Sequence, residues 1–388
     1  MKILLLHNYY QQAGGEDAVV CSEKELLESR GHSVRLLEAN NDGIKGVVGK
    51  VRAALGYMYS YASWQRVSAE LGQFRPDIVH VHNLFPVLSP SVLYVCSKAG
   101  VPVVQTLHNY RRLCAGSFLF RDGSICEKCI GKRIAIPAMA YGCYRGSKAG
   151  SLAIVASTAV HNALGTYEHK VRRYIALTEF AKNKFVEGGI SAAQLDVKPN
   201  FLERDPGVGD GRGNYILYVG RLSSEKGLDV LLRAWKGLGA LVPLKIAGEG
   251  PLADHCKRAS SENPAIEYLG HKSLPEVLTL MGNALALVFP SLWYEGFPRT
   301  IVESLAKGTP VIASNLGSMQ ELIAHRRTGL HFDPYAEGSL EEQVEWMLAH
   351  VQEIRCMRLA ARAEYELKYS AEKNHTMLMD IYQRAISQ

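Results

Sequence analysis

FPSLWYEGFPRTIVE, residues 289–303, is the segment whose pattern most clearly indicates how the chain folds. An apolar run at 284–289 leads into it and a second one begins at Pro310, as expected for two buried strands. Between them, Pro298 predicts the start of a helix, because proline is favoured at the first helical position. Strand, loop, helix and strand in this order are typical of a parallel sheet with crossover helices.

The same stretch carries two carboxylates. Glu295 is expected in the loop after the first strand, and Glu303 one to two turns into the helix. In open α/β sheets, ligands bind outside the carboxyl ends of the strands. Two carboxylates there, with the backbone N–H groups of a turn at Gly296 and Phe297, favour a ligand rich in hydroxyl groups. This points to a sugar, although two glutamates at this spacing also occur by chance.

Length and composition indicate a multidomain protein of ordinary soluble composition. At about 150 residues per domain, 388 residues predict two or three domains. Hydrophobic residues make up 47% and charged residues 21%, an ordinary soluble composition, and the net charge of +6 is modest. No apolar stretch is long enough to span a membrane, and the N-terminus becomes polar too early for a signal peptide. A cytoplasmic enzyme with reduced cysteines is therefore expected.

Strand-like and helix-like runs alternate along the chain and form two series. The first series of predicted strands is 2–7, 33–38, 77–82, 101–106, 174–177 and 195–198. The second is 215–219, 243–247, 266–269, 284–289, 310–313 and 329–332. Between the series, residues 201–214 are rich in Gly, Asp and Pro and have no periodicity. The prediction is an α/β protein with two Rossmann-like, doubly wound parallel-sheet domains facing across a cleft, 1–200 and 201–388, whose last helix is a candidate to return to the first domain.

Two further turns in the second series have the composition of a ligand site. In YVGRLSSEKG, residues 218–227, a strand leads into a helix, and Arg221 and Lys226 lie near the helix N-terminus. Cations and a helix N-terminus suit a diphosphate, but two solvated cations in a loop are the alternative. In AGEGPL, residues 247–252, two glycines let the backbone approach a flat ring, or form a plain turn. All three turns are expected at the carboxyl edge of one sheet, which makes coincidence a poor explanation.

These residues resemble the retaining glycosyltransferases of family 4, which have the GT-B fold and a signature of two glutamates separated by seven residues. The resemblance is close over 215–332 and looser over the N-terminal domain. It implies transfer of a sugar from a nucleotide-sugar donor with retention of the anomeric configuration.

The resemblance also implies roles for individual residues. Arg221 and Lys226 would bind the donor diphosphate, and Glu303 would accept hydrogen bonds from the ribose. Glu295 would contact the donor sugar, helped by the N–H groups of the next two residues. The turn expected to line the base pocket contains Gly248, Gly250, Pro251 and Leu252. Pro298 stands where many relatives have glycine and lacks an N–H, so the identity of the sugar does not follow.

In the N-terminal domain, Gly14 and Gly15 match the glycine loop of the family, which approaches the donor phosphate and the acceptor. A nicotinamide-binding G-x-G-x-x-G fingerprint is absent there. His108, at the end of a predicted strand, matches a family histidine beside the donor sugar, with a structural role as the alternative. His80 is expected in the core, and His82 either in the core or lining the cleft.

Cleavage of the sugar–phosphate bond leaves negative charge on the diphosphate. Preorganised cations stabilise such charge, so Arg221 and Lys226 are expected to do the work of a divalent ion, and no catalytic metal is expected. Together with His108 and Glu295 they are the predicted catalytic residues. The family resemblance implies attack from the front face, with the leaving phosphate taking the acceptor proton.

Four of the eight cysteines are clustered with the spacing C-x11-C-x2-C-x13-C: Cys114, Cys126, Cys129 and Cys143. Four thiolates can hold a tetrahedral structural zinc, and four reduced, unligated thiols are the alternative. Cys21, Cys96, Cys256 and Cys356 are isolated and expected in the core.

The cluster lies in an insertion of the first, acceptor-side domain, about residues 110–148, and this basic segment is also rich in apolar side chains. Its members are Arg111, Arg112, Arg121, Lys128, Lys132, Arg133, Arg145 and Lys148, interleaved with Phe118, Phe120, Ile134, Ile136, Met139 and Tyr141. Upstream, residues 44–74 have a long helical pattern with Lys45, Lys50, Arg52, Arg66, Tyr57, Tyr59, Tyr61 and Trp64. Such mixtures suit an anionic membrane surface or an acceptor with a lipid diphosphate, or they form an ordinary solvated face. Nucleic acid is not expected, since no binding motif occurs.

The leading hypothesis is a bacterial-type retaining glycosyltransferase of the hexosyltransferase type. It would act at the cytosolic face of a membrane on a lipid-linked or polysaccharide acceptor, in cell-surface glycan biosynthesis. The alternatives are a GT-B epimerase, a phosphorylase, for which no pyridoxal-lysine motif is evident, and a non-catalytic sugar-nucleotide binding protein.

Overall fold

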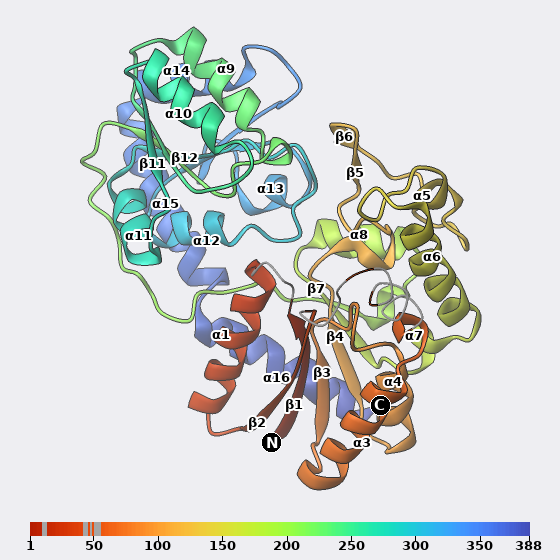
Figure 1. Ribbon diagram of the computed structural model, residues 1–388. Helices are drawn as coiled ribbons and strands as arrows, with labels where there is room; N and C mark the ends of the chain where they lie inside the picture. Colours follow the sequence, from red (N-terminus) through yellow and green to blue (C-terminus); the bar gives the residue numbers. More distant parts are fainter. Residues whose placement is uncertain (10–13, 42–45, 47–48, 50–55) are drawn as a thin grey trace. The chain divides into compact units, whose positions relative to one another are not determined.

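A computed structural model of the protein describes residues 1–9, 14–41, 46, 49 and 56–388 (Figure 1). The chain forms two compact units. The first comprises Met1–Leu119, Cys126–Glu203 and Ala371–Gln388, and the second Phe120–Ile125 and Arg204–Ser370. The expected range of 201–388 for the second domain therefore differs from the described unit at its end, because the last helix, α16 (Ala371–Ser387), belongs to the first unit.

The first unit is built on a six-stranded parallel sheet of order β2-β1-β3-β4-β7-β8. Its strands are β1 (Lys2–Tyr9), β2 (Ser33–Asn40), β3 (Ile78–Val81), β4 (Val103–Thr106), β7 (Arg173–Ala176) and β8 (Leu195–Val197). Its main helices are α1 (Gly15–Ser29), α3 (Tyr61–Phe74), α4 (Ser91–Lys98), α6 (Lys148–Ala163), α7 (Thr166–His169) and α8 (Glu179–Glu187). The strand order reverses after β2, as in a doubly wound fold, and all six predicted strands are confirmed.

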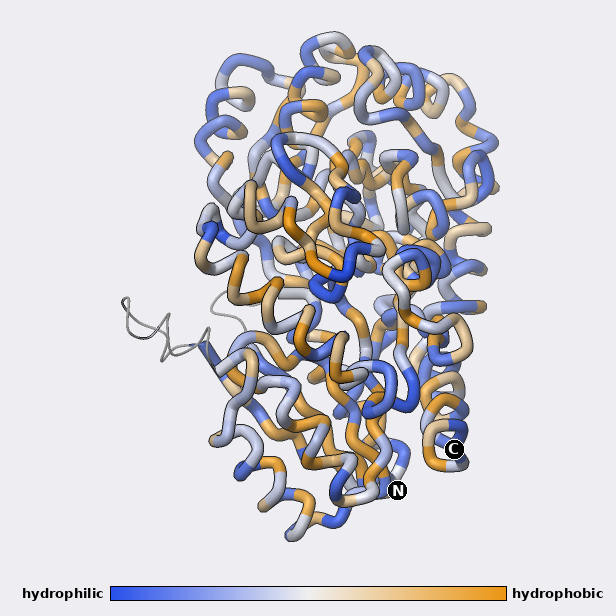
Figure 2. The backbone as a smooth tube through the Cα atoms, turned by 90° about the vertical axis from the view of Figure 1, so that its right-hand side faces the viewer, coloured by the Kyte–Doolittle hydropathy of each residue, from blue (hydrophilic) through white to orange (hydrophobic). Residues whose placement is uncertain are grey.

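The core of this unit explains why the last helix packs there. Residues 3–6 of β1 are completely buried, which fits a parallel sheet covered on both faces. Leu378, Ile381 and Tyr382 of α16 lie in one apolar cluster with Ile3 of β1 and other strand residues. In Figure 2 the helices alternate between hydrophobic and hydrophilic residues, as expected for helices with one buried side.

The second unit contains a six-stranded parallel sheet of order β11-β10-β9-β12-β13-β14. Its strands are β9 (Ile216–Val219), β10 (Leu244–Ala247), β11 (Ile266–Gly270), β12 (Ala286–Phe289), β13 (Val311–Ser314) and β14 (Gly329–Phe332). Its helices are α9 (Leu228–Leu238), α10 (Ala253–Glu262), α11 (Leu274–Asn283), α12 (Arg299–Ala306), α13 (Gly317–Leu322), α14 (Ser339–Ala349) and α15 (Val351–Lys368). The six predicted strands of this series are confirmed as well.

Two helix predictions need correction. Helix α12 begins at Arg299, so Pro298 is its N-cap residue and not its first residue. The helical pattern at 44–74 is interrupted, because residues 56–58 are helical, residues 59–60 are not, and α3 begins at Tyr61. There the Ser60 hydroxyl accepts a hydrogen bond from the Ser63 N–H at 3.2 Å. Of the cations expected on that pattern, Lys45, Lys50 and Arg52 lie outside the described residues.

The basic segment has more regular structure than its sequence indicates. It contains a 3-10 turn, η1 (Tyr110–Arg112), a short hairpin of β5 (Phe120–Arg121) and β6 (Ser124–Ile125), and helix α5 (Ile136–Ala140). Helix α6 follows, capped by the Ser147 hydroxyl. No helix in the described part of the chain is both long enough and apolar enough to cross a membrane.

Candidate active site

The turn between β12 and α12 holds Glu295 in a fixed position. Its carboxylate oxygen Oε1 accepts hydrogen bonds from the Ser291 hydroxyl at 2.5 Å, from Trp293 Nε1 at 2.7 Å and from Lys226 Nζ at 2.7 Å. The side chain is only 8% exposed. The Ser318 hydroxyl also donates to the backbone carbonyl of Glu295 at 2.8 Å. Three donors on one oxygen orient this carboxylate before any ligand binds.

Lys226 comes from the neighbouring turn, between β9 and α9. It ends the 3-10 turn η3 (Ser224–Lys226) and is followed by Gly227 with φ +72°. A Cβ at Gly227 would lie 1.7 Å from the carbonyl oxygen of Pro290, so only glycine lets the two turns meet. The Leu292 N–H donates to the Glu225 carbonyl at 2.9 Å. The Lys226–Glu295 pair is thus set by the backbone of both turns.

Arg221 lies in the same turn, about half exposed, and forms an ion pair with Glu225. The neighbouring turn at 248–252 packs directly on the backbone of the turn that contains Arg221. Cβ atoms at Gly248 and Gly250 would lie 1.9 Å and 2.5 Å from the carbonyl oxygens of Gly220 and Leu222. The two glycines are therefore required by this packing, a reason that differs from the approach of a ligand ring expected from the sequence. Pro251 is exposed, and Leu252 is half-buried.

Glu303 lies in α12 and is half-buried. Within the described part of the chain its carboxylate has no hydrogen bond or ion pair. Burial raises its pKa, and Arg299 partly opposes this shift. The backbone N–H groups of Gly296 and Phe297 also have no acceptor among the described residues, and the Phe297 ring lies edge-on to Tyr369 at 6.0 Å. This end of the sheet therefore offers one carboxylate and two donors to a ligand.

In the first unit, His108 follows β4 and is half-buried. Its Nε2 lies 3.0 Å from Nδ1 of His82, and the two rings stack at 5.3 Å. Burial, and secondly the neighbouring His82, hold the pKa of His108 well below its usual range. Burial and His80 likewise lower the pKa of His82 to about 3. Both imidazoles are therefore neutral at physiological pH.

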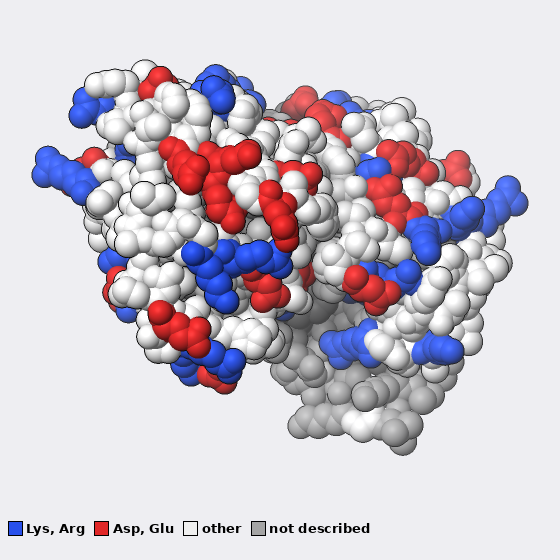
Figure 3. All heavy atoms as spheres, turned by 90° about the horizontal axis from the view of Figure 1, so that it is seen from above, with Lys and Arg blue, Asp and Glu red and all other residues white. Residues whose placement is uncertain are grey.

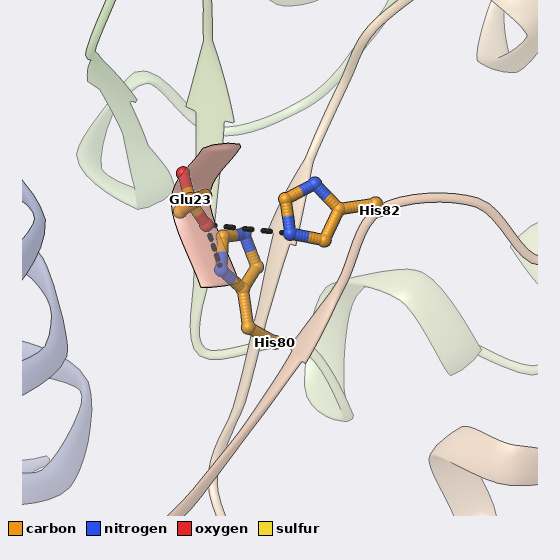
Figure 4. Close-up of side chains that lie close together, drawn as sticks. All are labelled: Glu23, His80 and His82. Atoms are coloured by element: carbon orange, nitrogen blue, oxygen red, sulfur yellow. Dashed lines mark ion pairs between the residues drawn. The ribbon is translucent and has the colours of Figure 1, made fainter. Parts of the chain in front are cut away.

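Behind these histidines lies a buried carboxylate, Glu23 of α1 (Figure 4). Its Oε1 is 2.9 Å from His80 Nδ1 and 3.3 Å from His82 Nε2, and its Oε2 accepts from Lys198 Nζ at 3.0 Å. Burial alone would raise the pKa of Glu23, but the neighbouring Lys198 and His80 hold this pKa well below its usual range. These ligand types could bind a metal, but the charge of the carboxylate is already balanced by the Lys198 ammonium. His80, expected in the core, is completely buried, and its Nδ1 lies 2.7 Å from the Tyr382 hydroxyl.

The glycine loop leads into α1, with Gly14 as N-cap and Gly15 as first helical residue. The Gly14 N–H donates to Asp17 Oδ2 at 2.8 Å, and Asp17 Oδ1 lies 2.7 Å from His7 Nε2. The adjacent Glu16 accepts hydrogen bonds from Asn83 at 3.0 Å and Asn109 at 3.3 Å. Burial, and secondly the charge of Asp17, raise the pKa of Glu16 to about 7.

Sequence reasoning singled out neither Glu16 nor Glu23. For Glu23 a signal existed, because Val19, Val20, Leu26 and Leu27 are buried at helical spacing around it, which places Glu23 on the apolar face of α1. Glu16 has no such signal, since its asparagine partners lie 67 and 93 residues away in the sequence.

The eight cysteines all lie in the described part and form no disulfide. Burial, and then the thiols of Cys114, Cys143 and Cys126, raise the pKa of Cys129 to about 11, so the four clustered thiols are electrostatic neighbours. Among the described residues, however, none of their sulfur atoms belongs to a group of three ligand atoms within 4.8 Å of one another. The structural zinc remains a prediction.

Of the isolated cysteines, Cys96 and Cys256 are buried as predicted. For Cys21 and Cys356 the prediction of a core position is wrong, because both are exposed.

Comparison with known proteins assigns the chain to a family. Residues 8–205 match the family described as Glycosyltransferase Family 4, and residues 202–364 match Glycosyl transferases group 1. An uncharacterised glycosyltransferase of Methanocaldococcus jannaschii is 27% identical over 353 residues, covering 84% of this chain and 83% of that protein.

Two solved structures have the same fold. The sucrose-phosphate synthase of Thermosynechococcus elongatus has a TM-score of 0.71 at 16% identity, covering 100% of this chain and 99% of its own. Anabaena HepE in complex with UDP-glucose has a TM-score of 0.67 at 17% identity, with both chains covered completely.

The two doubly wound parallel-sheet units have the GT-B fold. The family match extends over half of the chain and makes the assignment specific. The chain belongs to the family 4 glycosyltransferases.

Proposed function

We propose that this enzyme is a retaining hexosyltransferase with a nucleotide-sugar donor and a lipid-linked or polysaccharide acceptor, active in cell-surface glycan biosynthesis. The observation that carries the proposal is the Lys226–Glu295 pair, which lies where the turns after β9 and β12 meet. The complex of Anabaena HepE with UDP-glucose supports a donor of this kind.

The donor diphosphate would bind at Lys226 and the N-terminus of α9. The first N–H groups of a helix have no acceptor within the helix, and this end carries about half a positive charge. Both properties favour an anion next to the lysine. Arg221 would supply a second cation if its guanidinium exchanged Glu225 for a phosphate oxygen.

The sugar and the ribose would bind on the β12–α12 side. Glu295 has one oxygen saturated with donors, which leaves Oε2 to accept hydrogen bonds from sugar hydroxyls. The N–H groups of Gly296 and Phe297 would donate to the same sugar. Glu303 would accept from the ribose hydroxyls, and Gly248 to Leu252 would line the base.

In the reaction, the bond between the anomeric carbon and the diphosphate oxygen breaks, and the acceptor oxygen forms its bond on the same face. The acceptor proton moves to the departing phosphate oxygen. Lys226 and Arg221 stabilise the charge on that leaving group, so no divalent ion is needed for this step.

His108 would position the donor sugar from the first unit. A proton on His82 Nε2 is favoured because this atom faces the Glu23 carboxylate at 3.3 Å. His82 Nδ1 then accepts from His108 Nε2, which leaves Nδ1 of His108 as an acceptor for a sugar hydroxyl. The Gly14–Gly15 loop would approach the donor phosphate and the acceptor.

We also propose that the enzyme works at the cytosolic face of a membrane. Apolar side chains of the basic segment are exposed, among them Ile134, Ile136 and Tyr141. Figure 3 shows lysine and arginine side chains that project on the right of the face in view, next to aspartate and glutamate side chains. Sedimentation with vesicles should show binding to phosphatidylglycerol and loss of binding at high salt. Equal binding to neutral phosphatidylcholine vesicles would contradict an electrostatic contact.

The donor site is tested with a panel of UDP-, GDP- and ADP-sugars. One of them should raise the thermal midpoint, because a ligand that binds only the folded state stabilises it. Glu303→Ala should remove the shift, and Lys236→Met, an exposed cation of α9, should keep it. A panel without any shift would contradict a donor site. Conversion of the nucleotide-sugar into its epimer without an acceptor would favour an epimerase.

A further inference from the structure

The first unit has two adjoining pockets beside His108. The first, of about 60 Å³, is lined by His82, His108, Arg111 and Arg112, among others. The second, of about 40 Å³, shares both arginines and Thr158 with the first and continues towards α5. The two pockets thus adjoin at Arg111 and Arg112, and we call them together the path from His108 to the basic segment.

The charge along this path has one sign. Arg111, Arg112, Lys132 and Arg133 line the pockets, and no aspartate or glutamate is among the lining residues. Within the described residues, none of these four cations has a carboxylate within 4 Å. Glu16 acts on Arg111 electrostatically, but its hydrogen bonds go to asparagines.

Neutral groups fix the two arginines in place. The Arg111 guanidinium lies 4.0 Å from the centre of the Phe85 ring and donates to the Ala115 carbonyl at 3.2 Å. The Arg112 guanidinium lies 3.5 Å from the centre of the Tyr167 ring. In both arginines the Nε atom is buried and has no hydrogen-bond partner among the described residues. Both side chains are half-buried, so two ordered guanidinium groups without a carboxylate partner among the described residues are available to an anion.

The hydrogen-bond donors of the two arginines indicate which kind of anion would bind. Guanidinium groups recognise phosphate through pairs of parallel hydrogen bonds, and four cations can balance a group with several negative charges. The histidines on the path are neutral and add no charge of their own. Exposed Ile134 and Ile136 follow directly after Arg133, so an apolar chain attached to the anion would have a surface to contact.

We propose that Arg111, Arg112, Lys132 and Arg133 bind the phosphate or diphosphate group of the acceptor substrate. This inference rests on the proposed transferase function and names the acceptor as a phosphate ester. The phosphate can belong to a lipid carrier or to a soluble phosphorylated glycan.

The test is direct binding of inorganic pyrophosphate, measured by titration calorimetry. The full chain with Lys226→Met is used, so that pyrophosphate does not report on the donor site. In this background, Arg112→Met should weaken binding at least about tenfold, the loss expected for a charge-assisted contact. Arg145→Met is the matched control, because Arg145 is an exposed cation of the same segment that lines neither pocket, and it should leave binding unchanged.

A second variant is needed because Arg112 is partly buried, so Arg112→Met could lose binding through misfolding. Lys132 and Arg133 are exposed, so Lys132→Met with Arg133→Met should fold normally and still weaken pyrophosphate binding several-fold. If both variants bind pyrophosphate like the Arg145→Met control, the proposal is overturned.

A second ligand distinguishes the two sources of the phosphate. Tighter binding of a short polyprenyl diphosphate than of pyrophosphate would identify a lipid carrier, and equal binding a soluble phosphate ester. These measurements need no turnover. If no nucleotide-sugar stabilised the protein, the pyrophosphate result would still stand. If pyrophosphate did not bind, the result of the donor panel would still stand.

Discussion

The strongest prediction concerns Lys226, since this lysine serves both the fold of the turn and the proposed chemistry. Lys226→Met removes the ammonium that lies 2.7 Å from Glu295 Oε1. The Glu295 side chain, which is only 8% exposed, then keeps two hydrogen-bond donors, Ser291 and Trp293. The variant should lose stability and activity for separable reasons.

The loss of stability is limited by the remaining donors. Removing one partner of a buried ion pair costs about 3–5 kcal/mol. Lys226 is 19% exposed and Glu295 keeps two hydrogen bonds, so a smaller loss, about 2 kcal/mol, is expected. The loss of activity is larger, because one preorganised group that stabilises transition-state charge contributes about 10²–10³-fold to kcat.

The double variant Lys226→Met with Glu295→Gln separates the two effects. It leaves no unpaired charge, so its thermal midpoint should return towards that of the wild type, while kcat stays low. Activity is measured as acceptor-dependent release of the nucleotide, with Lys236→Met as the control. A single Lys226→Met variant with kcat within about threefold of the wild type would refute the leaving-group role, because the expected factor is at least about 100.

Three further predictions concern other residues. Glu303→Ala should raise the donor Kd about 10–100-fold, because a carboxylate bonded to a ribose diol contributes about 1.5–3 kcal/mol, and Glu303→Gln should lose less; calorimetric titration giving wild-type affinity would refute the ribose contact. The pKa of Glu16 is raised to about 7, so the stability linked to its protonation is present in full below about pH 4.5 and lost as the pH rises through 7. Glu16→Gln should therefore raise the free energy of unfolding at pH 8 by at most about 3 kcal/mol and leave it unchanged at pH 5, and an equal change at both pH values would contradict this. Purified protein should contain about one equivalent of zinc by elemental analysis, and Cys129→Ser should lose it; less than about 0.2 equivalents in the wild type would exclude the site.

The strands and the three turns of the second unit were predictable because their signals are local. Apolar runs such as 284–289 end at proline or glycine, and this pattern alone fixed where Lys226 and Glu295 lie on the sheet. The contact between these two side chains was not predictable. It depends on the backbone approach of Gly227 to Pro290, which joins segments far apart in the sequence.

Non-local packing also explains which contacts of the first unit could not be predicted from the sequence. The helical pattern of 371–387 predicts a helix that is a candidate to return to the first unit, and the contacts that hold it there, Tyr382 at His80 and Asn374 at Lys198, are not local in sequence. The charges around Glu23 have the same origin, because α1, β3 and the segment after β8 bring them together. In the basic segment, composition indicated cations, and the structure shows that Arg111 is packed against an aromatic ring, not solvated.

The central claim is that the site around Lys226, Glu295 and Glu303 transfers a sugar with retention. The most direct measurement is the anomeric configuration of the product, determined by NMR from the nucleotide-sugar that stabilises the protein. An α-linked donor should give an α-linked product. A β-linked product would contradict retention, since inversion requires attack on the face opposite the leaving group.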